Sequence, residues 1–289
     1  QIFGGDPAKM AAAAQIVEGM GADIVDINMG CPVPKISKHN AGCSLMREPQ
    51  HAASVVHAMT RAVKIPVTVK MRAGWNDATR NAPELAQPVQ DAGAAAVTIH
   101  GRTAEQSYKG YADWELVSRV AGDLSIPVLG SGDCIEPEQI VDRMRTGVSG
   151  VLVGRGVLRN PWILAQAADL ASGRPARQIT RAQRGRFLLD YIELLLNERV
   201  GEADGFRHAV PGVVVAANEK ARGHDRWVIN KIRALCSWYS KGVDCGSHLR
   251  VRVNSCESIA QLREIVDEFF FASLPASVDS NPAPDPAPV

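Results

Sequence analysis

The chain lacks three features that would place it in other protein classes. No stretch of its 289 residues is apolar for long enough to span a bilayer. The six cysteines form no Cys-x-x-Cys pair and have no zinc-ligand spacing, so we expect reduced thiols and no bound metal. The net charge is only +1, which excludes a broad electrostatic footprint for nucleic acid and leaves room for a local basic patch. We therefore expect a monomeric cytoplasmic protein with no membrane partner.

Short strand-like runs alternate with helical stretches over the first half of the chain. The predicted strands are residues 24–28, 66–72, 96–100, 127–130 and 150–154, with residues 1–3 as the tail of another. The predicted helices are residues 7–19, 50–62, 83–92, 114–121 and 137–145. This alternation predicts an α/β fold with a parallel sheet and helices packed against its apolar face.

Two of these strands repeat one polar pattern, Thr68-Val69-Lys70-Met71-Arg72 and Thr98-Ile99-His100-Gly101-Arg102. Side chains alternate along a strand, so the polar residues of each run share one face. In a helix-covered parallel sheet that face must line an interior. The carboxyl ends of TIM (β/α)8 barrel strands open into an active site, where such side chains can point. The sequence therefore predicts a barrel enzyme.

The second half of the chain predicts a different organisation. Only six strands can be counted, so we expect the sequence to begin inside the third barrel strand, with the first two βα units absent. Residues 1–165 form this partial barrel. Residues 182–200, 225–240 and 258–272 have helical patterns without intervening strands, which predicts a helical domain over residues 180–272. Residues 273–289 alternate Pro and Ala, which is typical of a disordered tail.

Cys31 is the candidate catalytic residue. It lies where a predicted strand gives way to a loop, in the run Asn28-Met29-Gly30-Cys31-Pro32. Gly30 lets the backbone pass close to a ligand and Pro32 prevents a helix from starting there, so the thiol is displayed at the mouth of the barrel. A lone cysteine is more often a buried, inert residue. Its position at a strand end beside Asn28 favours an acid.

Lys70 and His100 lie on neighbouring strands and would suit a ligand that accumulates negative charge. Taken singly, such a lysine is more often solvent-facing and such a histidine more often structural. The pattern that the two strands share favours the functional interpretation.

The last two predicted strands end in Ser131-Gly132-Asp133 and Gly154-Arg155-Gly156. The loops after strands seven and eight of many barrels bind a phosphate through backbone N–H groups, and an arginine adds charge-assisted hydrogen bonds. These two turns therefore predict a phosphorylated cofactor.

Five ordered motifs resemble the tRNA-dihydrouridine synthases, most closely the bacterial B-type members. The motifs are Gln1-Ile2-Phe3-Gly4, Asp26-Ile27-Asn28-Met29-Gly30-Cys31-Pro32, Val69-Lys70-Met71-Arg72-Ala73-Gly74-Trp75, Thr98-Ile99-His100-Gly101-Arg102-Thr103 and Gly154-Arg155. The resemblance runs from residue 1 to about residue 162 and resumes more weakly around residues 233–270. It implies an FMN-bearing TIM barrel with a helical tRNA-binding domain, which reduces uridines of tRNA to 5,6-dihydrouridine with NADPH.

The resemblance also implies roles for individual residues. Cys31 would protonate uracil C5 after hydride from reduced flavin N5 reaches C6, and Asn28 would hold the uracil. The expected FMN contacts are Gln1, Lys70, His100, Ser131, Gly132, Asp133, Gly154 and Arg155. The expected substrate or tRNA contacts are Arg72, Arg102 and Arg233. A uridine inside folded tRNA must be everted to be reached, which suits a deep pocket and a second RNA-binding domain.

Other interpretations stay open from sequence alone. An FMN barrel could act on a free pyrimidine-like molecule, as dihydroorotate dehydrogenases do, although a small substrate has no need of a helical domain. The chain could also be a catalytically inactive tRNA-binding relative, or a flavin-free phosphate-binding barrel. Residues 202–230 look like an insertion. Its Lys220, Arg222 and Arg226, with the neighbouring Lys231, would either contribute charge toward tRNA or form a solvated helix face.

Overall fold

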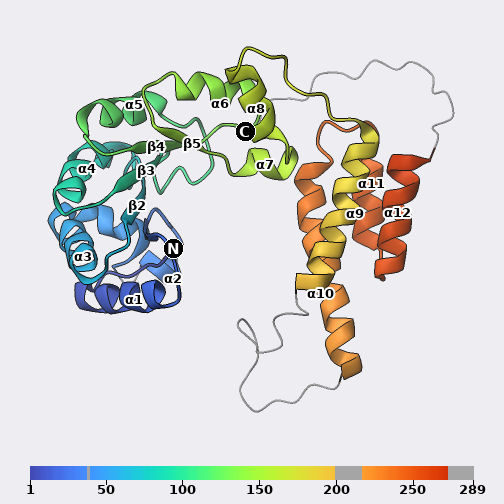
Figure 1. Cartoon of the computed structure of the whole chain (residues 1–289), viewed down its shortest axis with the longest axis horizontal. Coiled ribbons are helices and arrows are strands. Elements are labelled where there is room, and N and C mark those ends of the chain that lie inside the picture. The colour runs from blue at the N-terminus through green and yellow to red at the C-terminus, as the bar shows by residue number, and fades with distance from the viewer. Residues whose placement is uncertain (38–39, 199–216, 273–289) are drawn as a thin grey trace. The chain divides into compact units, whose positions relative to one another are not determined.

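A computed structural model describes residues 1–37, 40–198 and 217–272 (Figure 1). These residues divide into two compact units. The first contains Gln1–Gly156 and Ile163–Arg174, and the second contains Val157–Trp162 and the described residues from Pro175 onward.

The first unit is built on a parallel sheet whose strands follow one another in chain order. They are β1 (Val25–Met29), β2 (Val67–Arg72), β3 (Ala96–His100), β4 (Val128–Ser131) and β5 (Gly150–Leu152). Ile2 forms an isolated parallel bridge with Ile27 at the β1 edge, where the sequence predicts the tail of a further strand. Successive parallel strands with intervening helices are the repeating unit of a TIM barrel, which confirms the predicted fold class.

The intervening helices cover one face of this sheet, and Figure 1 shows α3, α4 and α5 along its outer side. The helical elements of the first unit are α1 (Pro7–Gly19), α2 (Pro34–Ser37), η1 (Gly42–Arg47), α3 (Pro49–Ala62), η2 (Asp77–Thr79), α4 (Ala82–Asp91), α5 (Trp114–Asp123), α6 (Pro137–Met144), α7 (Arg155–Arg159) and α8 (Ile163–Ala171). Local signals start several of them. Asp6 and Asp113 cap α1 and α5 by accepting the backbone N–H three residues on, and α3 and α6 begin with proline.

The two faces of the sheet differ in chemistry. Ile27, Val69 and Ile99 are fully buried and pack under the helices. The opposite face carries polar side chains in register, because Asn28 pairs with Lys70 and Arg72 pairs with His100. Thr68, Lys70 and Arg72 share this face, as the strand alternation predicts. The polar face therefore supplies the side chains of the candidate site.

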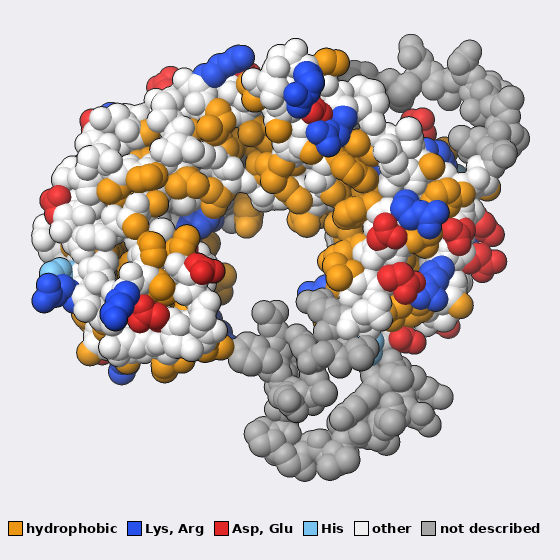
Figure 2. All heavy atoms as spheres, in the orientation of Figure 1, with side chains coloured by type: hydrophobic (Ala, Val, Ile, Leu, Met, Phe, Trp, Pro, Cys, Tyr) orange, Lys and Arg blue, Asp and Glu red, His pale blue; other side chains and the backbone are white. Residues whose placement is uncertain are grey.

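The second unit is helical. It consists of α9 (Arg181–Glu198), α10 (Ala217–Tyr239), α11 (Gly246–Ser255) and α12 (Ile259–Phe271), packed around a core that includes Leu188, Ile192, Ile232 and Val266. Figure 2 shows acidic and basic side chains intermixed on its surface, which agrees with the ion pairs Arg252–Glu268 and Arg263–Glu193. In the described ranges, no helix is both long and apolar enough to cross a membrane.

Candidate functional site

A chain of side-chain hydrogen bonds links the start of the protein to β1. Gln1 Nε2 donates to Asp26 Oδ2 at 2.5 Å, and Asn28 Nδ2 donates to Gln1 Oε1 at 2.9 Å. Thr68 Oγ1 donates to the other Asp26 oxygen at 2.6 Å. The structure thus brings together the predicted residues Gln1 and Asn28. Asp26, to which sequence reasoning gave no role, organises them, and the available signal was its position two residues before Asn28 on one strand face.

The loop that carries Cys31 is fixed from two sides. Asn28 Oδ1 accepts hydrogen bonds from the backbone N–H groups of Gly30 at 3.1 Å and Cys31 at 2.9 Å. The Cys31 carbonyl accepts the Cys43 N–H at 3.1 Å. Gly42 makes this approach possible, because it has φ +61° and a Cβ there would lie 2.7 Å from the Cys31 carbonyl oxygen. Cys31 is half-buried at the carboxyl end of β1.

Cys43, one residue after Gly42, has a different environment from Cys31. It is fully buried, and burial raises the pKa of its thiol to about 11. Such a thiol stays protonated and unreactive at neutral pH. The half-buried Cys31 is therefore the candidate of the pair.

Lys70 and His100 lie on adjacent strands of the polar face. Lys70 is half-buried, and its side chain forms no hydrogen bond or ion pair with any other residue that the structure describes. Burial and the nearby Arg72 lower its pKa, while Asp26 opposes the shift. Burial, with the positive charges of Arg72, Lys70 and Arg102, lowers the pKa of His100 to about 3. His100 is therefore a neutral imidazole at physiological pH, a hydrogen-bonding group rather than a cation.

Arg72 lies below the surface, with 5% of its area exposed. Its Nε donates to the Gly30 carbonyl at 2.8 Å, and its Nη1 donates to the carbonyls of Thr103 at 2.9 Å and Ser107 at 3.1 Å. Arg72 thus ties the Cys31 loop to the β3–α5 loop. These hydrogen bonds hold the backbone of the two loops in place. Because the Arg72 guanidinium is buried, it does not form part of a surface that tRNA could contact.

Arg102 is buried deeper still, with 2% exposed. It donates to the carbonyls of Lys109 at 3.1 Å and Gly110 at 2.6 Å, and to Asp133 Oδ1 at 2.6 Å. Its Nη1 is buried and has no hydrogen-bond partner among the described residues. A buried, unsatisfied cationic donor is costly, so this atom suits an anionic or carbonyl oxygen supplied by a ligand.

Asp133 connects the two predicted phosphate turns. Its Oδ2 accepts the Ala112 N–H at 2.6 Å, and its Oδ1 lies 3.7 Å from Arg155 in addition to its bond with Arg102. A carboxylate repels phosphate, so these contacts make Asp133 an anchor for Arg155 and the β3–α5 loop.

The other residues of the two turns leave room for a ligand. Gly154 is exposed, and a Cβ added there would meet nothing within 4 Å. Arg155 is 34% exposed in its side chain, and its guanidinium lies 5.0 Å from the Tyr108 ring centre. The Ser131 carbonyl accepts the Gly101 N–H at 3.1 Å, and the Gly132 carbonyl accepts the Trp114 indole N–H at 3.0 Å. Arg155 and the open turn at Gly154 therefore fit a phosphate, with Asp133 and Ser131 as support.

In the second unit, Arg233 stabilises a helix end. Its Nη2 donates to the Cys256 carbonyl at 2.7 Å and its Nε to the Val253 carbonyl at 3.3 Å, at the carboxyl terminus of α11. Lys231 and Arg226 are exposed, and the Lys231 ammonium lies 5.3 Å from the Trp227 ring centre. The predicted basic side chains Lys220 and Arg222 lie outside the residues whose side chains are described.

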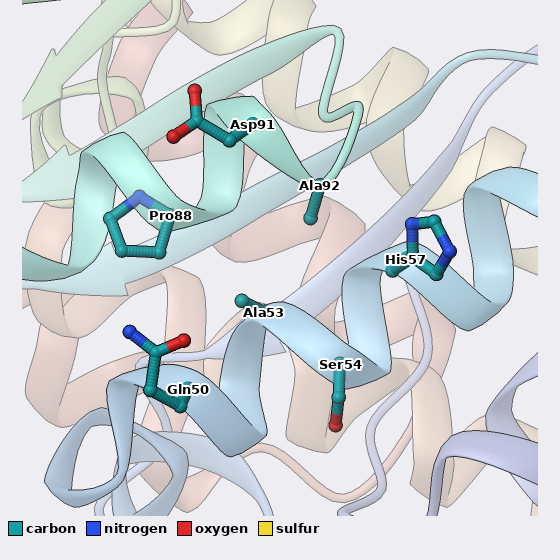
Figure 3. Close-up of a pocket in the computed structure, with 7 residues that line it drawn as sticks. All are labelled: Gln50, Ala53, Ser54, His57, Pro88, Asp91 and Ala92. Atoms are coloured by element: carbon teal, nitrogen blue, oxygen red, sulfur yellow. The ribbon is translucent and has the colours of Figure 1, made fainter.

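The grooves of the first unit lie away from these residues. Figure 3 shows one between α3 and α4, on the helical side of the sheet. It is lined by Gln50, Ala53, Ser54, His57, Pro88, Asp91 and Ala92. A second groove, between α6 and α8, has a mainly apolar lining that includes Met144 and Leu164. Neither contains a predicted site residue, so the candidate site rests on the strand-end cluster.

Comparison with known proteins identifies the family. The model of the dihydrouridine synthase family matches residues 1–233. The probable tRNA-dihydrouridine synthase of Rickettsia prowazekii is 35% identical over 279 residues, which cover 96% of this chain and 78% of that protein. The tRNA-dihydrouridine synthase B of Xanthomonas campestris is 37% identical over 274 residues, 94% and 75% of the two chains.

Solved structures match more loosely. DHODH from Eimeria tenella has 15% sequence identity and a TM-score of 0.44, and the match covers 55% of this chain and 52% of that one, which is too distant to carry an argument. The match to the family model, by contrast, covers residues 1–233, which contain all the residues of the strand-end cluster. The chain belongs to the dihydrouridine synthase family.

Proposed function

We propose that the protein reduces uridines of tRNA to 5,6-dihydrouridine, with FMN as its bound cofactor and NADPH as the reductant. The proposal extends the family membership and the names of the relatives. The observation that carries it is the placement of a half-buried Cys31 on the same strand-end edge as a neutral His100 and as Lys70, whose side chain has no partner among the described residues. The pattern of reduced thiols supports action in the cytoplasm.

The polar face has the groups that a flavin ring requires. FMN supplies hydride to uracil C6 when bound, and the protein orients it and adjusts its charge. Among the described residues the Lys70 side chain has no partner, so its ammonium would be available to the electron-rich edge of a reduced flavin ring. His100, as a neutral imidazole, supplies a hydrogen bond there without a second charge. Gln1 anchors the edge through Asp26 and Asn28.

The phosphate of FMN would bind at the turns after β4 and β5. Arg155 supplies the charge, and Gly154 leaves space for the oxygens. Gly132 and Ser131 contribute backbone, while Asp133 orients Arg155 and stays out of contact with the phosphate.

Cys31 donates the proton that completes the reduction at uracil C5. The hydride at C6 and this proton together saturate the 5,6 double bond, and the thiolate left on Cys31 is reprotonated from solvent. Asn28 Oδ1 already accepts two backbone N–H groups, so we propose that Asn28 positions the Cys31 loop. Arg72 supports the same loop through the Gly30 carbonyl.

We propose that residues 1–165 bind the cofactor and residues 180–272 bind tRNA. The exposed Lys231 and Arg226 support this role for the second unit, because phosphate contacts from lysine and arginine supply most nonspecific RNA affinity. Arg233 acts within the unit, as the cap of α11.

The test is product formation on tRNA that lacks dihydrouridine. Purified protein, FMN and NADPH are incubated with this tRNA. The tRNA is then digested to nucleosides, and dihydrouridine is quantified by mass spectrometry. Parallel reactions contain free uridine or orotate in place of tRNA. Formation of dihydrouridine in tRNA, with no turnover of free uridine or orotate, supports the proposal. Turnover of only the free pyrimidine, or a flavin-free protein that binds tRNA without turnover, would replace it with one of the two alternative functions.

A further inference from the structure

A guanidinium lies over an indole ring in the first unit, where Arg47 at the end of η1 meets Trp75 in the loop after β2. The Arg47 guanidinium carbon is 3.5 Å from the centre of the Trp75 ring, which is van der Waals contact over the ring face. Arg47 is exposed and Trp75 is half-buried. In the described part of the chain Arg47 makes no hydrogen bond and no ion pair, so its donors and its outer face are open to solvent. Arg80 differs, since it pairs with Asp77 and Asp113.

Both partners of this stack are held in place before any ligand arrives. The backbone N–H of Trp75 donates to the Thr79 carbonyl at 3.2 Å, and the Trp75 carbonyl accepts the Glu105 backbone N–H at 3.0 Å. Gly74 permits this tight loop, because a Cβ there would lie 1.9 Å from the Thr79 carbonyl oxygen. On the other side, Arg47 ends η1, whose preceding five residues are buried. A preorganised pair of this kind loses little conformational entropy on binding.

The stack is also connected to the candidate catalytic loop. The element η1 starts beside Cys31, since the Cys43 N–H donates to the Cys31 carbonyl. Trp75 follows β2, the strand that carries Lys70 and Arg72. The charge of Arg47 also reaches the Cys43 thiol, where it favours the ionised form. The stack is therefore linked through η1 to the Cys31 loop and through β2 to the strand that carries Lys70.

We propose that Arg47, supported by Trp75, is a stacking platform for an unpaired RNA base that flanks the target uridine. Single-stranded RNA is bound by stacking of its splayed bases on aromatic rings and arginine planes. A uridine everted toward Cys31 leaves its neighbouring bases unstacked, and a planar cation beside the Cys31 loop would compensate for the lost stacking. The proposal rests on the proposed function, because it takes tRNA as the ligand.

The test separates stacking from charge. Dissociation constants of flavin-loaded protein for fluorescently labelled tRNA are measured over a range of salt concentrations, with Arg47→Lys, Arg47→Ala and Trp75→Leu. The matched controls are Arg119→Lys and Arg119→Ala, which change an exposed arginine on α5. We expect Arg47→Lys to weaken binding about tenfold while the salt slope is kept, because the charge remains and the plane is lost. Arg47→Ala should weaken it further and reduce the slope by about one.

The outcomes distinguish this proposal from the proposed function. Binding by Arg47→Lys equal to wild type, or losses equal to those of the Arg119 controls, would overturn the platform. Trp75→Leu is scored only if its melting temperature and flavin content match wild type, and Arg47→Lys decides the matter alone otherwise. A protein that binds tRNA with the Arg47 dependence and forms no dihydrouridine would refute the proposed activity and keep the platform. Normal dihydrouridine synthesis, with tRNA binding that does not depend on Arg47, would support the proposed activity and refute the platform.

Discussion

The two units differ in where their charged side chains lie. In the first unit, Arg72 and Arg102 are buried at the strand ends and donate to loop carbonyls, next to a neutral His100. In the second, the large helix cluster is apolar, with Leu195 only 3% exposed, and pairs such as Arg263–Glu193 lie on its surface. Buried polar groups cost free energy unless they are satisfied. The first unit therefore carries buried cationic groups that depend on loop carbonyls, and one of them, Arg102 Nη1, has no partner among the described residues, whereas the ion pairs of the second unit lie on its surface.

The largest expected effect is on the reaction itself. Cys31→Ala should lower dihydrouridine formation by about 10² to 10⁴, the typical loss on removing a general acid, and leave flavin and tRNA binding intact. Cys245→Ala, which removes an exposed thiol of the second unit, should have no effect. Rates are compared from the mass of product nucleosides at matched flavin content. An active Cys31→Ala enzyme would end the proton-donor assignment.

A core substitution in the second unit should change stability and not chemistry. Leu195→Ala removes a buried side chain from α9 and should cost about 2–5 kcal/mol of unfolding free energy. The adjacent Leu194→Ala removes the same atoms from a side chain that is 60% exposed and should cost far less. Denaturant unfolding measures both. Loss of bound flavin in Leu195→Ala under native conditions would contradict the division of labour between the units.

Lys70→Met should weaken flavin retention about ten- to a hundredfold, because the ring loses a nearby counter-charge in a partly buried position. Lys64→Met, at an exposed position before β2, is the control. Flavin absorbance is followed during dialysis of the two variants and the wild type. Equal retention in all three would place the Lys70 ammonium away from the cofactor.

His100 makes stability depend on pH in a defined direction. Its pKa is about 3 in the folded protein and about 6.5 when unfolded, so below pH 6.5 the unfolded state binds the extra proton. Stability should fall as the pH drops from 6.5 to 5, by at most about 1.4 kcal/mol per pH unit from this group. The stability of His100→Gln should depend less steeply on pH than that of the wild type over this range. Parallel slopes for His100→Gln and wild type would show that His100 binds its proton over the same pH range in the folded and unfolded protein, which would contradict the lowered pKa.

The smallest effects concern the surface of the second unit. Lys231→Gln should reduce the slope of log affinity for tRNA against log salt by about one, since one phosphate contact is lost. Arg233→Gln removes the cap of α11 and should lower the melting temperature while the slope is kept. If Arg233→Gln reduces the salt slope and Lys231→Gln leaves it unchanged, Arg233 rather than Lys231 is the tRNA contact.

The sequence predicted the regular elements of the first unit well. Strand β3 has the predicted bounds and β2 starts one residue later than predicted, while β1 and β4 are shifted by one residue at both ends, because apolar residues alternate along these strands. Strand β5 ends at Leu152, two residues before the predicted end, and its residues do not alternate in burial. The polar face of the sheet was predictable from the same two-residue alternation of side chains along a strand. The predicted division at residue 165 falls within α8, which packs with the first unit. Helix α11 was not predicted, since the residue that precedes it, Cys245, has φ +57° and provides no capping side chain.

The contacts of the arginines could not be predicted from the sequence. Arg72 and Arg102 share the strand pattern of a substrate site, and only the folded β3–α5 loop supplies the carbonyls that surround them. The stacking of Arg47 on Trp75 likewise joins two loops far apart in sequence. The roles of Cys31, Lys70 and the two phosphate turns stay predictions until a ligand is bound.

Anaerobic single-turnover kinetics test the central claim most directly, that the polar strand-end edge of the first unit reduces uridine in tRNA. Protein with its flavin reduced is mixed with tRNA that lacks dihydrouridine, and the flavin absorbance is followed with Cys31→Ala measured in parallel. The account predicts that tRNA oxidises the wild-type flavin with one dihydrouridine formed per flavin, and that Cys31→Ala reacts about 10² to 10⁴ times more slowly. Reoxidation by free orotate or uridine, with none by tRNA, would contradict it.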